Sequence, residues 1–241
     1  MMINFPDATY IHRRMPKEAF YKRLSLTTAL KDKFISDVDR IYIENSLTKD
    51  NLNLTADSEV KEILLLSITL KKQEFDGKVV EAIARQNPHQ LVFLLTYEDQ
   101  RQLAIYHGKL YRTEWMPDEE LKLDAHGFSL EEIWNGLIEQ IALYEERASS
   151  SERLSIDQRL ALQEKILKLE KQIKKTETAA WKETQPKKRF DLYQRVQKYK
   201  QELEVLKNGE SYDAYAGSGR GELQEAGRAV PQCCHRNHYR I

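Results

Sequence analysis

The sequence predicts an α+β protein in which a compact body, built on a mixed β-sheet with flanking helices, precedes a C-terminal helical hairpin arm. Two apolar segments of strand length, residues 60–71 and 90–97, flank a helical segment. Beyond residue 152, apolar residues recur at the four-three spacing of paired helices. The chain has 241 residues, 41% of them hydrophobic, so one domain of roughly 150 residues can bury a substantial core.

The N-terminal part of the chain predicts two helices and a strand. Pro16 suits the first turn of a short helix, because its missing N–H would have no partner there. Four apolar residues spaced four apart line one face of a second helix: Leu26, Leu30, Phe34 and Val38. Residues 41–43 then predict a strand, and the polar, turn-forming residues 48–58 predict a loop.

The central part of the chain predicts the sheet. The apolar segment 60–71 is a buried strand, and a helix follows from Asp76, its expected N-cap, and ends before Pro88. A second strand, 90–97, turns tightly at 98–100 into the alternating residues 103–106, and a third strand near 111–115 extends this hairpin. Strands joined by a helix are expected to be parallel, and those joined by a tight turn antiparallel.

The last helix of the body has the clearest start in the sequence. Ser129 with Glu132 forms a capping box, and Phe128 is positioned to pack on Ile133 as a hydrophobic staple. The small polar residues 148–151 then break the pattern, which predicts a hinge. The body therefore spans residues 1–148.

Residues 152–207 predict a charged helical hairpin. One apolar row consists of Leu162, Ile166, Leu169 and Ile173, and a second of Leu192, Val196, Tyr199, Leu203 and Leu206. Because Thr184-Gln185-Pro186 breaks the chain between the rows, the two helices can fold back on each other. The same rows could also pair between chains, which leaves a homo-oligomer open.

Residues 208–241 have the composition of a disordered tail. No lysine follows Lys207, and five of the nine glycines lie between Gly209 and Gly227. We interpret this tail as added or altered late, for example by a change of reading frame, and assign it no role.

Composition excludes several protein classes. Lysine plus arginine equals aspartate plus glutamate at 38 each, so the chain as a whole has no preference for polyanions. The longest apolar run, 63–70, is shorter than the roughly 20 residues of a membrane-spanning helix, and no secretory signal is visible. The two cysteines, Cys233 and Cys234, are adjacent and cannot close a long loop. We expect a cytoplasmic protein without membrane contact.

Charge is distributed unevenly between the two halves of the C-terminal region. Residues 98–152 hold thirteen acidic and five basic side chains, whereas residues 153–207 hold fifteen basic and eight acidic ones. Tyr193 and Tyr199 interleave with basic residues that are candidates for nucleic-acid or partner contact: Lys187, Lys188, Arg189, Arg195 and Lys198. Arg13, Arg14 and Lys17 could add to that surface. The alternatives are a solvated coiled-coil face, or an arm that rests against the acidic body.

A metal-dependent nuclease of the restriction-endonuclease type is the rival hypothesis. Such an enzyme places a carboxylate on one strand and an acid-x-lysine on the next. Glu59-Val60-Lys61 has the second spacing, and Glu44 or Asp57 could supply the first carboxylate. Glu62, beside an apolar strand, is more simply explained as a carboxylate paired with a nearby cation.

Other chemical motifs are weak. His12, His89, His107 and His126 have no relay spacing, and no glycine-rich phosphate loop precedes a helix in the body. Cys233, Cys234, His235 and His238 suggest adventitious metal binding at most. We therefore expect no cofactor, no dedicated metal site and no identifiable catalytic residue.

Several short motifs occur in a characteristic order: Phe5-Pro6, Arg14-Met15-Pro16-Lys17, Asn51-Leu52-Asn53-Leu54, Glu62-Ile63 and Leu91-Val92-Phe93-Leu94-Leu95. In this order and separation the chain resembles the bacterial family catalogued as domain of unknown function 4391, as far as about Leu206. The resemblance implies a bacterial host and an accessory protein near DNA, since family members often sit beside genes for helicases and DNA methyltransferases of restriction or phage-defence systems. It transfers no catalytic residue.

The sequence-based hypothesis is accordingly a non-enzymatic accessory protein of a DNA-processing, restriction or phage-defence system. The body would dock a protein partner, such as a helicase or methyltransferase component, and the arm would contact that partner or DNA. The nuclease and a purely structural oligomerisation module remain the alternatives.

Overall fold

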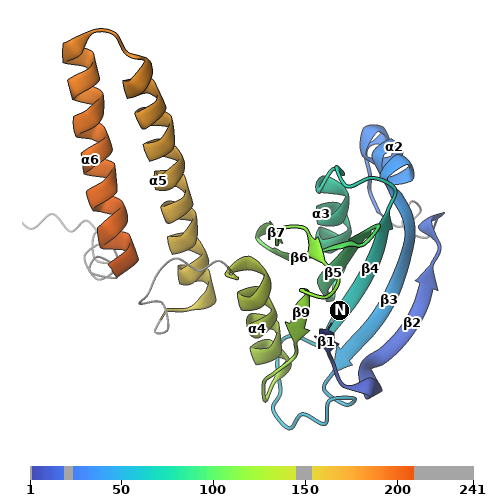
Figure 1. Cartoon of the computed structure of the whole chain (residues 1–241). Helices are drawn as coiled ribbons and strands as arrows, with labels where there is room; N and C mark the ends of the chain where they lie inside the picture. Colours follow the sequence, from blue (N-terminus) through green and yellow to red (C-terminus); the bar gives the residue numbers. More distant parts are fainter. Residues whose placement is uncertain (1, 19–23, 145–153, 209–241) are drawn as a thin grey trace, which may run out of the picture.

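The computed structural model describes residues 2–18, 24–144 and 154–208. Its elements follow in the order β1 (Met2–Asn4), a 3₁₀ turn η1 (Asp7–Thr9), β2 (Tyr10–Met15), α2 (Thr28–Asp37), β3 (Val38–Thr48), β4 (Glu62–Leu70), α3 (Lys78–Arg85), β5 (Gln90–Tyr97), β6 (Gln100–His107), β7 (Lys109–Arg112), β8 (Met116–Pro117), β9 (Lys122–Asp124), α4 (Leu130–Ala142), α5 (Ile156–Lys182) and α6 (Pro186–Asn208). The fold is of the predicted α+β class, with helices gathered at the C-terminal end (Figure 1).

A mixed sheet forms the centre of the body. Its strands run in the order β2-β3-β4-β5-β6-β7, with β8 also paired to β6. The strands β4 and β5, joined by α3, are parallel, while β5 and β6, joined by a tight turn, are antiparallel. Both pairings confirm the expectation from loop type. The short strands β1 and β9 form a separate parallel pair.

Helices cover both faces of the sheet, because β4 and β5 are apolar on both sides. On one face Leu66, Phe93 and their neighbours pack with α2 and α3. On the other face Leu65 and Val92 pack with α4 and with Leu123 of β9. The body therefore has two apolar layers separated by the sheet (Figure 1).

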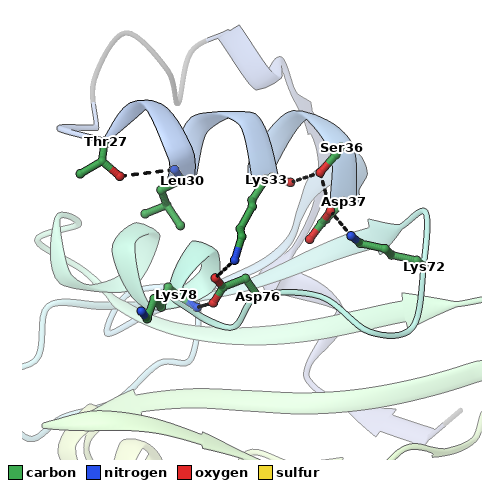
Figure 2. Close-up of polar contacts among 8 residues, drawn as sticks. All are labelled: Thr27, Leu30, Lys33, Ser36, Asp37, Lys72, Asp76 and Lys78. Atoms are coloured by element: carbon green, nitrogen blue, oxygen red, sulfur yellow. Dashed lines mark hydrogen bonds and ion pairs between the residues drawn. The ribbon is translucent and has the colours of Figure 1, made fainter.

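The helix α2 is attached to the body mainly by polar contacts, which Figure 2 shows. Thr27 caps its start by accepting a hydrogen bond from the Leu30 N–H at 3.3 Å. Lys33 contacts the carboxylate of Asp76 at 2.6 Å, and Lys72 contacts Asp37 at 2.7 Å. Apart from Phe34, few side chains of α2 reach the core, so these ion pairs fix the helix on α3 and on the end of β4.

Several predicted boundaries are corrected by the structure. The N-cap of α3 is Gly77 and not Asp76, although Asp76 still accepts a hydrogen bond from the Lys78 N–H at 3.0 Å. Helical geometry begins at Lys17, one residue after Pro16. The strand expected near 111–115 is β7, Lys109–Arg112. The extended β1, β2 and β9 were not expected.

The start of α4 also differs from expectation in one respect. Ser129 caps the helix by accepting a hydrogen bond from the Glu132 N–H at 3.1 Å. Glu132, however, accepts a hydrogen bond from the N–H of Phe128 and not from that of Ser129, so the second half of the expected capping box is wrong. The expected staple is wrong, because the side chain of Phe128 is 83% exposed and makes no apolar contact that could fix the helix entry.

The helices α5 and α6 form the predicted antiparallel hairpin (Figure 1). The α5 row Leu162, Ile166, Leu169 and Ile173 is buried, as is Val196 of α6. A capping box at Ser155 and Gln158 begins α5, and Pro186 begins α6. The expected hinge at 148–151 lies outside the described residues, as does the predicted tail 208–241 except for Asn208, which is the last residue of α6 and not part of a tail.

Candidate nucleic-acid interface

The hairpin arm exposes most of its basic side chains because its apolar row is narrow. Val196 is the one fully buried residue of α6, and Leu192, Tyr199 and Leu203 are half-buried. A row this narrow covers about a third of the helix circumference, so the remaining positions face solvent. The sequence fills these positions with charged residues.

The five predicted contact residues of α6 are all exposed: Lys187, Lys188, Arg189, Arg195 and Lys198. None of the ion pairs within residues 2–18, 24–144 and 154–208 involves any of them. By contrast, Lys200 pairs with Glu177 at 2.8 Å and Lys207 with Glu170 at 3.0 Å. The α6 segment from Lys187 to Lys198 therefore carries positive charge without ion-pair partners among the described residues, while Lys200 and Lys207 form ion pairs with α5.

The N-terminal candidates lie elsewhere. Arg13 and Arg14 are exposed on β2, the edge strand of the sheet. Lys17 is half-buried, and its ammonium donates a hydrogen bond to the carbonyl oxygen of Val38 at 2.6 Å. Figure 1 shows β2 at the opposite side of the body from the arm. These three residues do not extend the basic surface of α6 but form a separate one.

Sequence reasoning missed the aromatic residues of the hairpin turn. It singled out Tyr193 and Tyr199, of which Tyr199 is half-buried and Tyr193 is 38% exposed. The more exposed rings are Trp181, at 79%, and Phe190, at 60%. The sequence did contain a signal for the exposure of these two rings. Each residue is outside the apolar row of its helix and within five residues of the break at 183–185.

The residues of the proposed nuclease site are not brought together. Glu44 lies within β3 and contacts His12 at 2.7 Å, and Asp57 contacts Lys49 at 2.5 Å in the loop before β4. Glu59 lines a different hollow, between α4 and the start of α5. Across the described part of the chain, no group of three or more His, Cys, Asp or Glu side chains is arranged to hold a metal ion.

A hollow of about 550 Å³, lined by both polar and apolar side chains, lies on the part of the sheet that α4 leaves uncovered. Its wall includes His12, whose ring stacks on Tyr42 at 4.9 Å between centroids and contacts Glu44. His12 has a positive φ of 45° within a bulge of β2, a backbone geometry that aims its ring at β3. Arg101 is held there by Asp118 at 3.0 Å.

Three histidines that appeared isolated in the sequence each contact a carboxylate. Besides His12 with Glu44, His89 contacts Glu62 at 3.1 Å and His107 contacts Asp157 at 2.6 Å. Glu62 also accepts a hydrogen bond from Ser46 at 2.5 Å, which agrees with its interpretation as a paired strand-end carboxylate.

No described helix has an apolar stretch of the length that a bilayer crossing requires. A search of curated proteins and a search of solved structures each return no significant match. The family model described as Domain of unknown function (DUF4391) matches residues 3–203, which include the body and nearly all of the hairpin arm. The chain is therefore a member of the DUF4391 family.

Proposed function

We propose that this protein is a non-enzymatic accessory module of a bacterial DNA-processing or defence system, whose hairpin arm contacts DNA. One observation carries the proposal: the cations of α6 nearest the hairpin turn are exposed and lack acidic partners among the described residues. Cations of the hairpin arm that lack acidic partners can neutralise DNA backbone phosphates and release their counterions, and this release drives binding.

The shape of the molecule supports this role. In Figure 1 the arm extends from the body, so its far end can reach a ligand without contact between that ligand and the sheet. The acidic side chains that neutralise Lys200 and Lys207 are Glu177 and Glu170 of α5. The body itself would dock a protein partner, for which the helicase or methyltransferase components of such systems are the candidates.

The oligomerisation alternative has less support. The apolar row of α5 is already covered by α6 of the same chain, with Ile166 fully buried. A second chain would have to displace this contact before it could use the same row. The nuclease alternative has no assembled carboxylate pair in its favour.

The test is binding of the full chain to a fluorescent duplex at low and moderate salt, with and without Mg²⁺. The arm variant Lys187→Glu/Lys188→Glu is compared with the body variant Lys61→Glu/Lys122→Glu, which changes net charge equally at exposed positions. Because each phosphate contact contributes about −0.9 to the slope of log K against log salt, we expect the arm variant to reduce that slope by about 2.

The body variant should bind as the wild type does. Equal weakening by both variants would show that net charge alone drives binding, and absence of binding at low salt would reject the DNA role. Shortening of the duplex that requires Mg²⁺ would contradict the non-enzymatic assignment.

A further inference from the structure

The far end of the arm carries two large aromatic side chains that contribute little to the fold. Trp181 is 79% exposed and Phe190 is 60% exposed. Trp181 is the residue before the last one of α5, and Phe190 is the fifth residue of α6. At 1.5 Å per residue, both rings are attached within about 6 Å of the helix ends that form the turn (Figure 1).

The helix pair is held together at this end by other residues. Ala180 is completely buried at the end of α5, and Val196 is buried in α6. Because Trp181 follows Ala180 directly, its side chain is rotated by about 100° from the buried row. A ring in that position stays in water, where its large apolar surface gains nothing from folding. Two such rings at one turn indicate a contact surface.

The charge around the rings is predominantly positive. Within residues 181–191 there are four cations, Lys182, Lys187, Lys188 and Arg189, and two carboxylates, Glu183 and Asp191. Glu183 accepts a hydrogen bond from the N–H of Gln185 at 2.9 Å, which holds it in the turn. No ion pair within the described residues neutralises any of the four cations.

Exposed aromatic rings beside cations without ion-pair partners favour binding of a polyanion whose planar groups are accessible for stacking. In duplex DNA the base faces are stacked inside the helix and only base edges and the backbone are exposed, so aromatic rings have no base face on which to stack. In a single strand the bases are free to stack on aromatic side chains while cations follow the backbone. An apolar docking site for a protein would instead be expected to hold few charges at its centre.

We propose that the tip of the arm, defined as residues 181–190, binds single-stranded nucleic acid, with unpaired bases stacked on Trp181 and Phe190 and flanking phosphates on the four cations. This inference rests on the proposed DNA role of the arm and specifies its ligand. A module that binds the unpaired strand could act together with a partner protein that opens or scans duplex DNA.

The experiment measures binding of the full chain to fluorescein-labelled dT12 and to a 12-base-pair duplex by anisotropy. We expect the wild type to prefer dT12, and each ring-to-alanine change at the tip to weaken dT12 binding about fivefold or more, since stacking of one base on one ring contributes at least about that factor. Duplex binding should change less than twofold. The matched control is Phe128→Ala, which removes a ring that is 83% exposed on the body.

A second readout follows Trp181 directly. Titration with dT12 should quench tryptophan fluorescence in the wild type, and Trp181→Phe should abolish this quenching while retaining most of the affinity. Trp115 and Trp134 serve as internal references, because both lie in the body.

The outcomes separate the two proposals. Duplex binding through the α6 cations without preference for dT12, or without an effect of the ring variants, would overturn the single-strand inference and leave the DNA role intact. Loss of binding to both ligands would reject both. Ring-dependent binding to vesicles of phosphatidylcholine and phosphatidylserine, without ring-dependent dT12 binding, would overturn the inference in favour of a membrane surface.

Discussion

Asp37 is a buried carboxylate that the fold keeps charged. Its side chain is 2% exposed, and burial alone raises the pKa of a carboxyl group. Hydrogen bonds from Lys72 and Ser36 outweigh this effect and leave the pKa of Asp37 below its ordinary value. The pKa of Asp76 is lowered as well, first because Lys33 donates a hydrogen bond to it. Both carboxylates hold α2 in place through their charged form (Figure 2).

These lowered pKa values predict acid sensitivity. A group whose folded pKa is below its unfolded value of about 3.9 contributes stability that is fully present above that value and is lost as pH falls through the folded pKa. Asp37→Asn should reduce the free energy of unfolding at pH 7 by about 1.5–3 kcal/mol and flatten its dependence on pH below 5. Urea denaturation between pH 2.5 and 7 measures both quantities.

The exposed Asp99 provides the comparison for this measurement. Asp99→Asn should leave the urea midpoint within experimental error of the wild type. If Asp37→Asn retained the full acid dependence of the wild type, the stabilising role of the Lys72 contact would be rejected.

The arm depends on one row of apolar contacts. Ile166 is fully buried between α5 and α6, whereas the next residue, Leu167, is 46% exposed. The two residues are neighbours in α5 and have nearly the same volume. The difference between them is therefore contact with the facing helix, which is the interaction that keeps the hairpin closed.

Removing this contact should open the arm selectively. Ile166→Ala is expected to destabilise the hairpin by about 2–5 kcal/mol, and Leu167→Ala by well under 1 kcal/mol. Hydrogen exchange of backbone amides in α5 and α6 measures the change, with the amides of β4 and β5 as an internal standard. Similar effects of the two variants would mean that the row at Ile166 does not hold the hairpin.

Ion pairs and a small apolar contact connect the base of the arm to the body. Arg159 of α5 contacts Glu139 of α4, and Lys109 of β7 contacts Glu164. His107 of β6 contacts Asp157 at 2.6 Å. The apolar contact is small, since Leu160 and Ile156 are the arm residues that join the core layer under α4. We expect the ion pairs to contribute to the orientation of the arm, which extends from the body (Figure 1).

Charge reversal at this base should release the arm. Arg159→Glu is expected to broaden the distance distribution between a label on the body and one at the hairpin turn, measured by single-molecule energy transfer. The double variant Arg159→Glu/Glu139→Arg should restore most of the original distribution, because the pair is re-formed with reversed charge. A coupling of about 1 kcal/mol or less is expected, since Glu139 is 44% exposed. A distribution unchanged by Arg159→Glu would show that the linker or the apolar contact sets the orientation.

Local patterns were sufficient for much of this fold. The four-three rows of α5 and α6 and the helix between two apolar strands were predicted, because each depends on residues within one or two turns of each other. The strands β1 and β9 were not, since they pair only with each other across about 120 residues. The strand β2 was also missed, because nearly every side chain of this edge strand is exposed and its sequence lacks an apolar alternation.

The positive charge of the arm and its hairpin form could be derived from residue order alone, since helix period and charge count are properties of short segments. Which cations remain unpaired depended on the fold, because α5 brings Glu177 and Glu170 to Lys200 and Lys207 but no acid to Lys187 or Lys188. The separation of Arg13 and Arg14 from the arm likewise followed from packing between distant segments. The spacing of apolar residues predicts which face of a helix is buried. Which residues lie near its other faces depends on the tertiary fold.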